Sequence, residues 1–269
     1  MSPLDGDWVG ASHHRHRTAR RRLWGWSVWN TQVTLGNVLD HVQTIQRALI
    51  GEPVTIWSLV SLSRVVQEGV VRVCHLYEAG LSPEQRAVRI AAAWLNGARQ
   101  HQVAARDVGP EAVPKADRIW EDASRTVQRA GMSIGLDGKG RPNSAVLGSV
   151  KASFTVNLTE ASKQPPHLPA WYRISSAASH STVWMVAQAY GFDEDEPVMR
   201  ADPEIVTASV LAVLGAFEEL VQTLGTYHGK DPQPAVLTIQ RRTVAVINRQ
   251  HKWRKQARED ARPLLGDDI

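Results

Sequence analysis

The chain has 269 residues, of which 43% are hydrophobic, and carries a formal net charge of +4. This composition excludes a wholly disordered chain and is sufficient for one large domain or two small ones. The single cysteine, Cys74, excludes an internal disulfide and is typical of a buried thiol in a reducing cytoplasm. No segment has the ~18 consecutive apolar residues of a membrane span, and no hydrophobic leader follows the N-terminal arginines. We therefore expect a cytoplasmic protein that does not enter a membrane.

Both ends of the chain are basic. Residues 1–30 include the run HHRHRTARRRLWGWSVW, which combines five arginines with three tryptophans, and we expect this segment to be a mobile, solvated tail. Residues 241–269 are expected to form a basic C-terminal helix and tail. Because Arg and Lys neutralise phosphates and Trp stacks on bases, both ends are suited to binding a polyanion.

Between these ends, nearly every long segment has the period of an amphipathic helix. We predict an all-α fold, a bundle of about eight helices, with residues 31–240 as the main domain. Ser82 and Gln85 form a capping pattern at the start of one helix, and Asp202 is the expected N-cap of another. The expected helices cover 31–50, 53–79, 82–105, 114–130, 146–163, 169–190, 202–229 and 234–258.

Residues 131–148 interrupt the helical pattern. Five glycines and a proline within this segment predict a turn-rich connector, and its DGKG sequence is suited to closing a short hairpin. A phosphate-binding loop is not predicted, because the segment has no Gly-Lys-Ser/Thr sequence and follows no strand.

The stretch WYRISSAASHSTVWMV, residues 171–186, places candidate catalytic side chains on one face of a helix. At about 100° per residue, these side chains form a single stripe beside small residues that permit close approach. Seven residues rise about 10 Å, so we do not expect the arginine and the histidine to touch each other. They are placed to reach one phosphate, or to meet their counterparts across a two-fold axis. The stripe consists of Arg173, Ser176, His180 and Trp184.

A second polar stripe lies in the otherwise apolar segment 53–79, where Arg64, Glu68 and Arg72 are spaced four residues apart. Charges in a central helix are unfavourable unless they are paired or open to a cleft. Two interpretations follow. Glu68 pairs with either arginine in a network that fixes the packing of the bundle, or the stripe faces Arg173 and His180 across a polar cleft.

Two segments together, SLSRVVQEGVVRVCHLYEAGLSPEQRAVR and YRISSAASHSTVW, resemble a group of actinobacterial proteins of unassigned function, which are similar to the HEPN superfamily. The resemblance covers roughly residues 35–225 and implies a HEPN-like helical core. Arg173 and His180 match the Arg-x4-6-His signature of that superfamily. Positions typical of the actinobacterial group and of its polar helix are matched by Tyr172, Ser176, Arg64 and Glu68. One residue departs from the pattern: Ile174 stands where active nucleases usually carry a polar residue.

Many HEPN proteins are metal-independent ribonucleases whose sites are commonly completed in a homodimer. The resemblance therefore implies an RNA substrate, no metal and no cofactor, in a toxin or defence setting. His180 would take the proton of a ribose 2′-hydroxyl or protonate the leaving 5′-oxygen, and Arg173 would stabilise charge on the phosphate. Ser176 would add a hydrogen bond, and the product would be a 2′,3′-cyclic phosphate.

Two alternatives come from other classes of protein. The first is a catalytically inactive binding or regulatory module in which Arg173, Glu68 and His180 form a buried polar network, an interpretation that Ile174 favours. The second is a metal site in a helical bundle, formed by Glu68, His41 and His180. The sequence lacks the Glu-x-x-His pairs that are typical of di-iron bundles.

Overall fold

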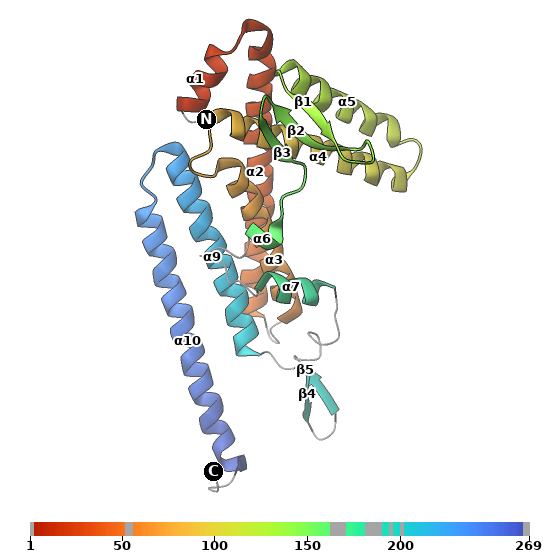
Figure 1. Cartoon of the computed structure of the whole chain (residues 1–269). Coiled ribbons are helices and arrows are strands. Elements are labelled where there is room, and N and C mark those ends of the chain that lie inside the picture. Colours follow the sequence, from red (N-terminus) through yellow and green to blue (C-terminus); the bar gives the residue numbers. More distant parts are fainter. Residues whose placement is uncertain are drawn as a thin grey trace. The chain divides into compact units, whose positions relative to one another are not determined.

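The fold is known from a computed structural model, which describes residues 3–51, 56–161, 171–180, 190–193, 196–199 and 202–265. It is mostly helical, which confirms the predicted all-α class (Figure 1). The helices are α1 (Pro3–Ala11), α2 (His14–Ile50), α3 (Ile56–Tyr77), α4 (Pro83–Val108), α5 (Val113–Arg129), α6 (Leu158–Ala161), α7 (Trp171–Ser179), α9 (Pro203–His228) and α10 (Gln233–Leu265). The strands are β1 (Ser133–Leu136), β2 (Pro142–Leu147), β3 (Val150–Ser153), β4 (Tyr190–Asp193) and β5 (Glu196–Met199).

The chain divides into two compact units, and neither is continuous in sequence. The first unit comprises residues 1–33, 72–157 and 223–230, and the second comprises residues 34–71, 158–222 and 231–269. Our division of the chain at residues 30 and 240 follows the sequence order, and it stays a prediction.

In the first unit, the basic N-terminal segment is helical, so the expectation of a solvated tail is wrong for the described residues. Ala19, Leu23 and Ser27 recur every four residues in α2 and are all buried. The guanidinium of Arg20 lies 3.9 Å from the ring centroid of Trp8. The segment thus has a packing face of small and apolar residues, which its high arginine content obscured.

Two helix starts agree with their sequence signals. At α4, the Ser82 hydroxyl accepts a hydrogen bond from the Gln85 backbone N–H, and the Gln85 side chain accepts one from the Ser82 N–H, which completes the predicted capping box. At α9, a carboxylate oxygen of Asp202 accepts a hydrogen bond of 2.7 Å from the Glu204 N–H. Both caps satisfy backbone donors that the first turn of a helix leaves free.

The turn-rich connector supplies β1 and β2 of an antiparallel sheet whose strand order is β1-β2-β3. The hairpin expected at DGKG is confirmed, since the Asp137 N–H donates to the Arg141 carbonyl over 2.8 Å. The helix expected over 146–163 is wrong, because the end of β2 and β3 lie in the first half of this range and, among its described residues, only those of the short α6 are helical. β2 turns into β3 at Gly148, which has a φ of 58°. The sheet packs against α4 and α5 (Figure 1), and this packing outweighs the weak helical pattern.

The second unit is built around a cluster of buried apolar side chains from α3, α7 and α9. Beside this cluster, α10 runs along α9 (Figure 1), with Gln240 donating to Glu218 over 2.9 Å and Arg254 paired with Glu204 at 2.7 Å. None of the helices in the described part of the chain is long and apolar enough to cross a membrane. The buried members of the cluster are Ile56, Val60, Trp171, Ala178, Ile205 and Ala212.

Candidate functional site

The short helix α7 carries the candidate catalytic residues on the side opposite its buried face. Trp171, Ser175 and Ala178 are buried, at a spacing that places them on one side of the helix. The indole N–H of Trp171 donates to the Ser63 hydroxyl of α3 over 3.1 Å, and the Ser179 hydroxyl donates to that of Ser61 over 3.3 Å. Helix α7 is therefore attached to α3 at both of its ends.

Between these ends, Arg64, Glu68 and Tyr172 form a polar cluster that joins α3 to α7. Oε1 of Glu68 accepts a hydrogen bond of 2.8 Å from Nε of Arg64 and one of 3.3 Å from the Tyr172 hydroxyl. The guanidinium carbon of Arg64 lies 5.1 Å from the Tyr172 ring centroid. Burial opposes the charge of Arg64, but its hydrogen bond and attraction to Glu68, with the contribution of Tyr172, raise the pKa of Arg64. Within the cluster, Glu68 and Tyr172 therefore compensate the energetic cost of partly burying the charge of Arg64.

The remaining predicted site residues lie outside the polar cluster. Arg173 and His180 are both exposed, and His180 follows the last residue of α7, its backbone N–H donating to the Ser176 carbonyl over 3.0 Å. Arg72 is exposed and forms no ion pair with the described residues. Trp184 lies outside the described residues. The structure therefore separates the predicted site into a half-buried polar cluster and an exposed Arg173–His180 face.

Ile174 has a packing role. It is partly buried against the apolar cluster of the second unit. Because consecutive helical residues point about 100° apart, Ile174 can pack inward while Arg173 faces solvent. The apolar residue that departs from the nuclease pattern thus belongs to the buried side of α7.

The two alternative arrangements are not present among the described residues. Arg173 and His180 do not form a buried network with Glu68, which pairs with Arg64 and Tyr172 instead. The described His, Cys, Asp and Glu residues include no group of three that could hold a metal ion. Glu68, His41 and His180 are accordingly not assembled as a metal site.

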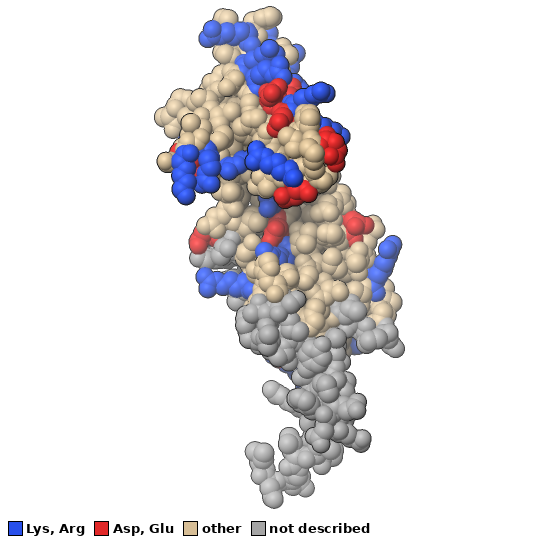
Figure 2. All heavy atoms as spheres, turned by 90° about the vertical axis from the view of Figure 1, so that its right-hand side faces the viewer, with Lys and Arg blue, Asp and Glu red and all other residues tan. Residues whose placement is uncertain are grey.

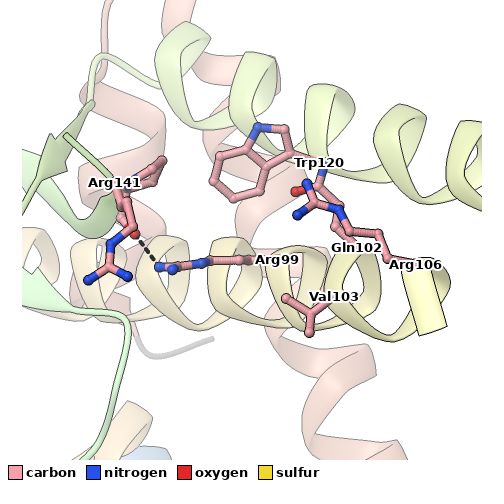
Figure 3. Close-up of a pocket in the computed structure, with 7 residues that line it drawn as sticks. Arg99, Gln102, Val103, Arg106, Trp120 and Arg141 are labelled. Atoms are coloured by element: carbon pink, nitrogen blue, oxygen red, sulfur yellow. Dashed lines mark hydrogen bonds between the residues drawn. The ribbon is translucent and has the colours of Figure 1, made fainter. Parts of the chain in front are cut away.

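A pocket of about 350 Å³ in the first unit contains residues that our sequence analysis did not single out (Figure 3). Three of them, Arg99, Gln102 and Arg106, share one face of α4 because they are spaced i, i+3 and i+7. This spacing could have predicted their shared face from the sequence. The contribution of Arg141 could not be predicted in this way, because Arg141 reaches the pocket from the sheet region and not from α4.

Comparisons of the chain with models of protein families, with curated proteins and with solved structures found no match. The HEPN-like assignment stays a prediction that rests on the motif residues described above.

Proposed function

We propose that the chain is a metal-independent endoribonuclease of the HEPN-like type and that its catalytic face is the exposed side of α7. One observation carries the proposal: Arg173 and His180 are both open to solvent, while the opposite side of α7 is held in the core by Trp171. A helix that is anchored in the core and presents a cation, with a histidine directly after its last residue, is suited to binding and cleaving a phosphodiester.

The chemistry needs only groups on this face and the RNA itself. The His180 imidazole accepts the proton of a ribose 2′-hydroxyl, and the 2′-oxygen attacks the adjacent phosphorus. The bond from phosphorus to the 5′-oxygen breaks, and that oxygen takes a proton from solvent. Arg173 donates hydrogen bonds to the non-bridging oxygens, whose negative charge grows as the new bond forms. The products are a 2′,3′-cyclic phosphate and a free 5′-hydroxyl.

Helix geometry favours a site that two copies of the chain complete. Arg173 and His180 are separated by seven residues, or about 10 Å along a helix axis, so they approach a phosphate from two sides. A second copy related by a two-fold axis would place its own arginine beside the first copy's histidine. A homodimer is therefore part of the proposal.

The test is cleavage of 5′-labelled single-stranded RNA by the purified chain in the presence of EDTA. Wild type is compared with Arg173→Ala, His180→Ala and His101→Ala, the last being an exposed histidine on α4. We expect Arg173→Ala and His180→Ala to cleave at least about 100-fold more slowly than wild type, since this is the usual contribution of an acid–base group or an oxyanion donor. His101→Ala should cleave at the wild-type rate.

Three results would contradict the proposal: equal rates for all four proteins, loss of cleavage in EDTA, or no cleavage by wild type. A terminal 2′,3′-cyclic phosphate, identified by mass spectrometry, separates this chemistry from hydrolysis by a contaminating metal-dependent nuclease.

The second candidate is an RNA-binding module without catalysis. It is favoured by the side chain that follows Arg173, which is the packed Ile174 and not a polar group. In that case wild type leaves RNA intact, yet Arg173→Ala weakens RNA binding in a fluorescence polarisation assay by about tenfold, the value of one charge-assisted hydrogen bond.

A further inference from the structure

The pocket in the first unit combines several cations with an aromatic wall. Arg99 and Arg106 enter it from α4, Arg141 from the residue before β2, and Trp120 from α5. Figure 3 shows Trp120 on the α5 side facing Arg99, with Arg141 and Arg106 toward opposite ends. Figure 2 shows Lys and Arg side chains spread over the face that carries α5 and the sheet, with Asp and Glu among them. The pocket is therefore electropositive and has an apolar surface on which a flat ring can lie.

Two of the three arginines, Arg99 and Arg141, are held in place by hydrogen bonds. A guanidinium nitrogen of Arg99 donates to the Pro142 carbonyl, which leaves its other N–H groups available. Asp137 fixes Arg141: one carboxylate oxygen accepts from the Arg141 backbone N–H over 2.9 Å, and the other accepts from Nε over 2.9 Å. These hydrogen bonds lower the pKa of Asp137, and the one from the Arg141 backbone N–H has the largest effect. A charged Asp137 offsets much of the Arg141 charge, whereas Arg106 is exposed and has no acidic partner among the described residues.

A polar residue near Trp120 is also oriented. The side-chain amide N–H of Gln102 donates to Asp117 of α5 over 2.7 Å. This bond leaves the Gln102 amide oxygen as an acceptor, suited to the exocyclic amine or ring N–H of a base. The Asp117 carboxylate at this end disfavours a second anionic group, so the phosphate belongs near Arg99 and Arg141, and the ring belongs near Trp120 and Gln102.

We infer that this pocket binds a nucleoside monophosphate unit, with its phosphate on Arg99 and Arg141 and its base against Trp120. Its volume of about 350 Å³ lies at the lower end of small-molecule sites, which suits one nucleotide. The unit comes either from a free nucleotide or from single-stranded RNA, since both present the same phosphate and base. The inference uses only residues of the first unit and is independent of any activity at α7.

The test is isothermal titration of the full chain with each of the four nucleoside 5′-monophosphates, their unphosphorylated nucleosides, and inorganic phosphate. At least one monophosphate should bind about tenfold or more tightly than its nucleoside, because charge-assisted hydrogen bonds to the phosphate are lost in the latter. It should also bind more tightly than inorganic phosphate, because the base adds contact with Trp120.

Two variants on exposed arginines form a matched pair. Arg106→Glu reverses a charge in the pocket, whereas Arg118→Glu makes the same change on α5 outside it. We expect about tenfold or greater weakening for Arg106→Glu and less than about twofold for Arg118→Glu. Trp120→Ala should weaken nucleotide binding and leave phosphate binding unchanged, and Trp120→Phe should restore much of the loss.

Comparing affinities decides whether the natural ligand is RNA or a free nucleotide. If a 5′-phosphorylated RNA tetranucleotide binds about tenfold more tightly than the best monophosphate, the site is assigned to RNA. If the tetranucleotide binds more weakly than the monophosphate, the site is assigned to a free nucleotide. The inference is overturned if no monophosphate binds more tightly than its nucleoside, or if the two charge-reversal variants behave alike. A Trp120→Ala protein that does not fold leaves the decision to the exposed arginine pair.

Discussion

The hydroxyl of Tyr172 lies 3.3 Å from Oε1 of Glu68, the same carboxylate oxygen that Arg64 holds at 2.8 Å. Tyr172 and Glu68 are 104 residues apart in sequence. This single oxygen therefore ties α7, which carries the candidate catalytic face, to a charged pair on α3.

Replacing Glu68 by Ala should destabilise the protein more than an ordinary surface change. Arg64 would keep its charge in a site where its side chain is only 18% exposed, and Tyr172 would lose its acceptor. We expect the free energy of unfolding to fall by about 1–2 kcal/mol, a range reduced for partial exposure. The measurement is urea denaturation. Glu121→Ala is the control, because its i,i+4 pair with Arg125 has side chains 64% and 62% exposed and should contribute below about 0.5 kcal/mol. Equal losses in the two variants would contradict the structural role of the polar cluster.

Two glycine-to-alanine changes should have opposite signs. A Cβ on the buried Gly69 would lie 2.6 Å from a methyl carbon of Val38, which is itself fully buried, so Gly69→Ala forces α2 and α3 apart. We expect a loss of about 1–3 kcal/mol, as for other overpacked cores. A Cβ on Gly97 meets nothing within 4 Å, so Gly97→Ala should stabilise α4 by about 0.5–1 kcal/mol through helix propensity. Chemical denaturation of both proteins checks the pair, and a neutral Gly69→Ala would show that the helices do not approach closely.

The ion pair between Asp5 and Arg86 should dominate the attachment of α1 to α4. Its side chains are 0% and 7% exposed, with Nη1 and Oδ1 2.9 Å apart. Asp5→Asn leaves a buried guanidinium without its counter-charge, for which we expect a loss of about 3 kcal/mol. Asp122→Asn breaks an exposed pair with Arg22 and should lose less than about 1 kcal/mol. Faster amide hydrogen exchange confined to α1 would accompany the Asp5 change. Similar losses in both variants would contradict the burial of the first pair.

His75 should make the stability depend on pH. Burial, and to a lesser extent the charge of Arg89, lower the pKa of His75 to about 4, while Glu78 acts in the opposite direction. The ordinary value in an unfolded chain is about 6.5, so the unfolded state binds the extra proton first as pH falls. The contribution of His75 to the free energy of unfolding is therefore complete above pH 6.5. It is lost as pH falls from 6.5 to 4, by about 1 kcal/mol per pH unit or less after allowance for partial exposure.

The variant His75→Asn should therefore lose stability less steeply than wild type between pH 7 and pH 5. Thermal melts at several pH values measure the slope. His101→Asn removes an exposed histidine from α4 and should leave the slope of wild type unchanged. Parallel slopes for wild type and His75→Asn would assign the pH dependence to other groups.

The features that could be predicted from the sequence are those set by neighbouring residues. Ser82 with Gln85, and Asp202, mark helix starts because their side chains bond to backbone groups two or three residues away. The DGKG hairpin is equally local, since Asp137 accepts hydrogen bonds from residues up to four positions later. The i,i+4 pairing of Arg64 with Glu68 follows from helix geometry alone.

The sequence by itself determined the helical class, the best-capped helix starts, and the presence of Arg173 and His180 on one short stretch. Only the tertiary structure decided that residues 150–153 join a sheet, that Tyr172 and not Arg173 meets Glu68, and that Arg141 approaches Arg99 across 42 residues. The physical reason is the same in each case. Strand pairing and contacts between helices depend on partners far away in the chain, and local propensities of a few tenths of a kcal/mol do not encode which partners will meet.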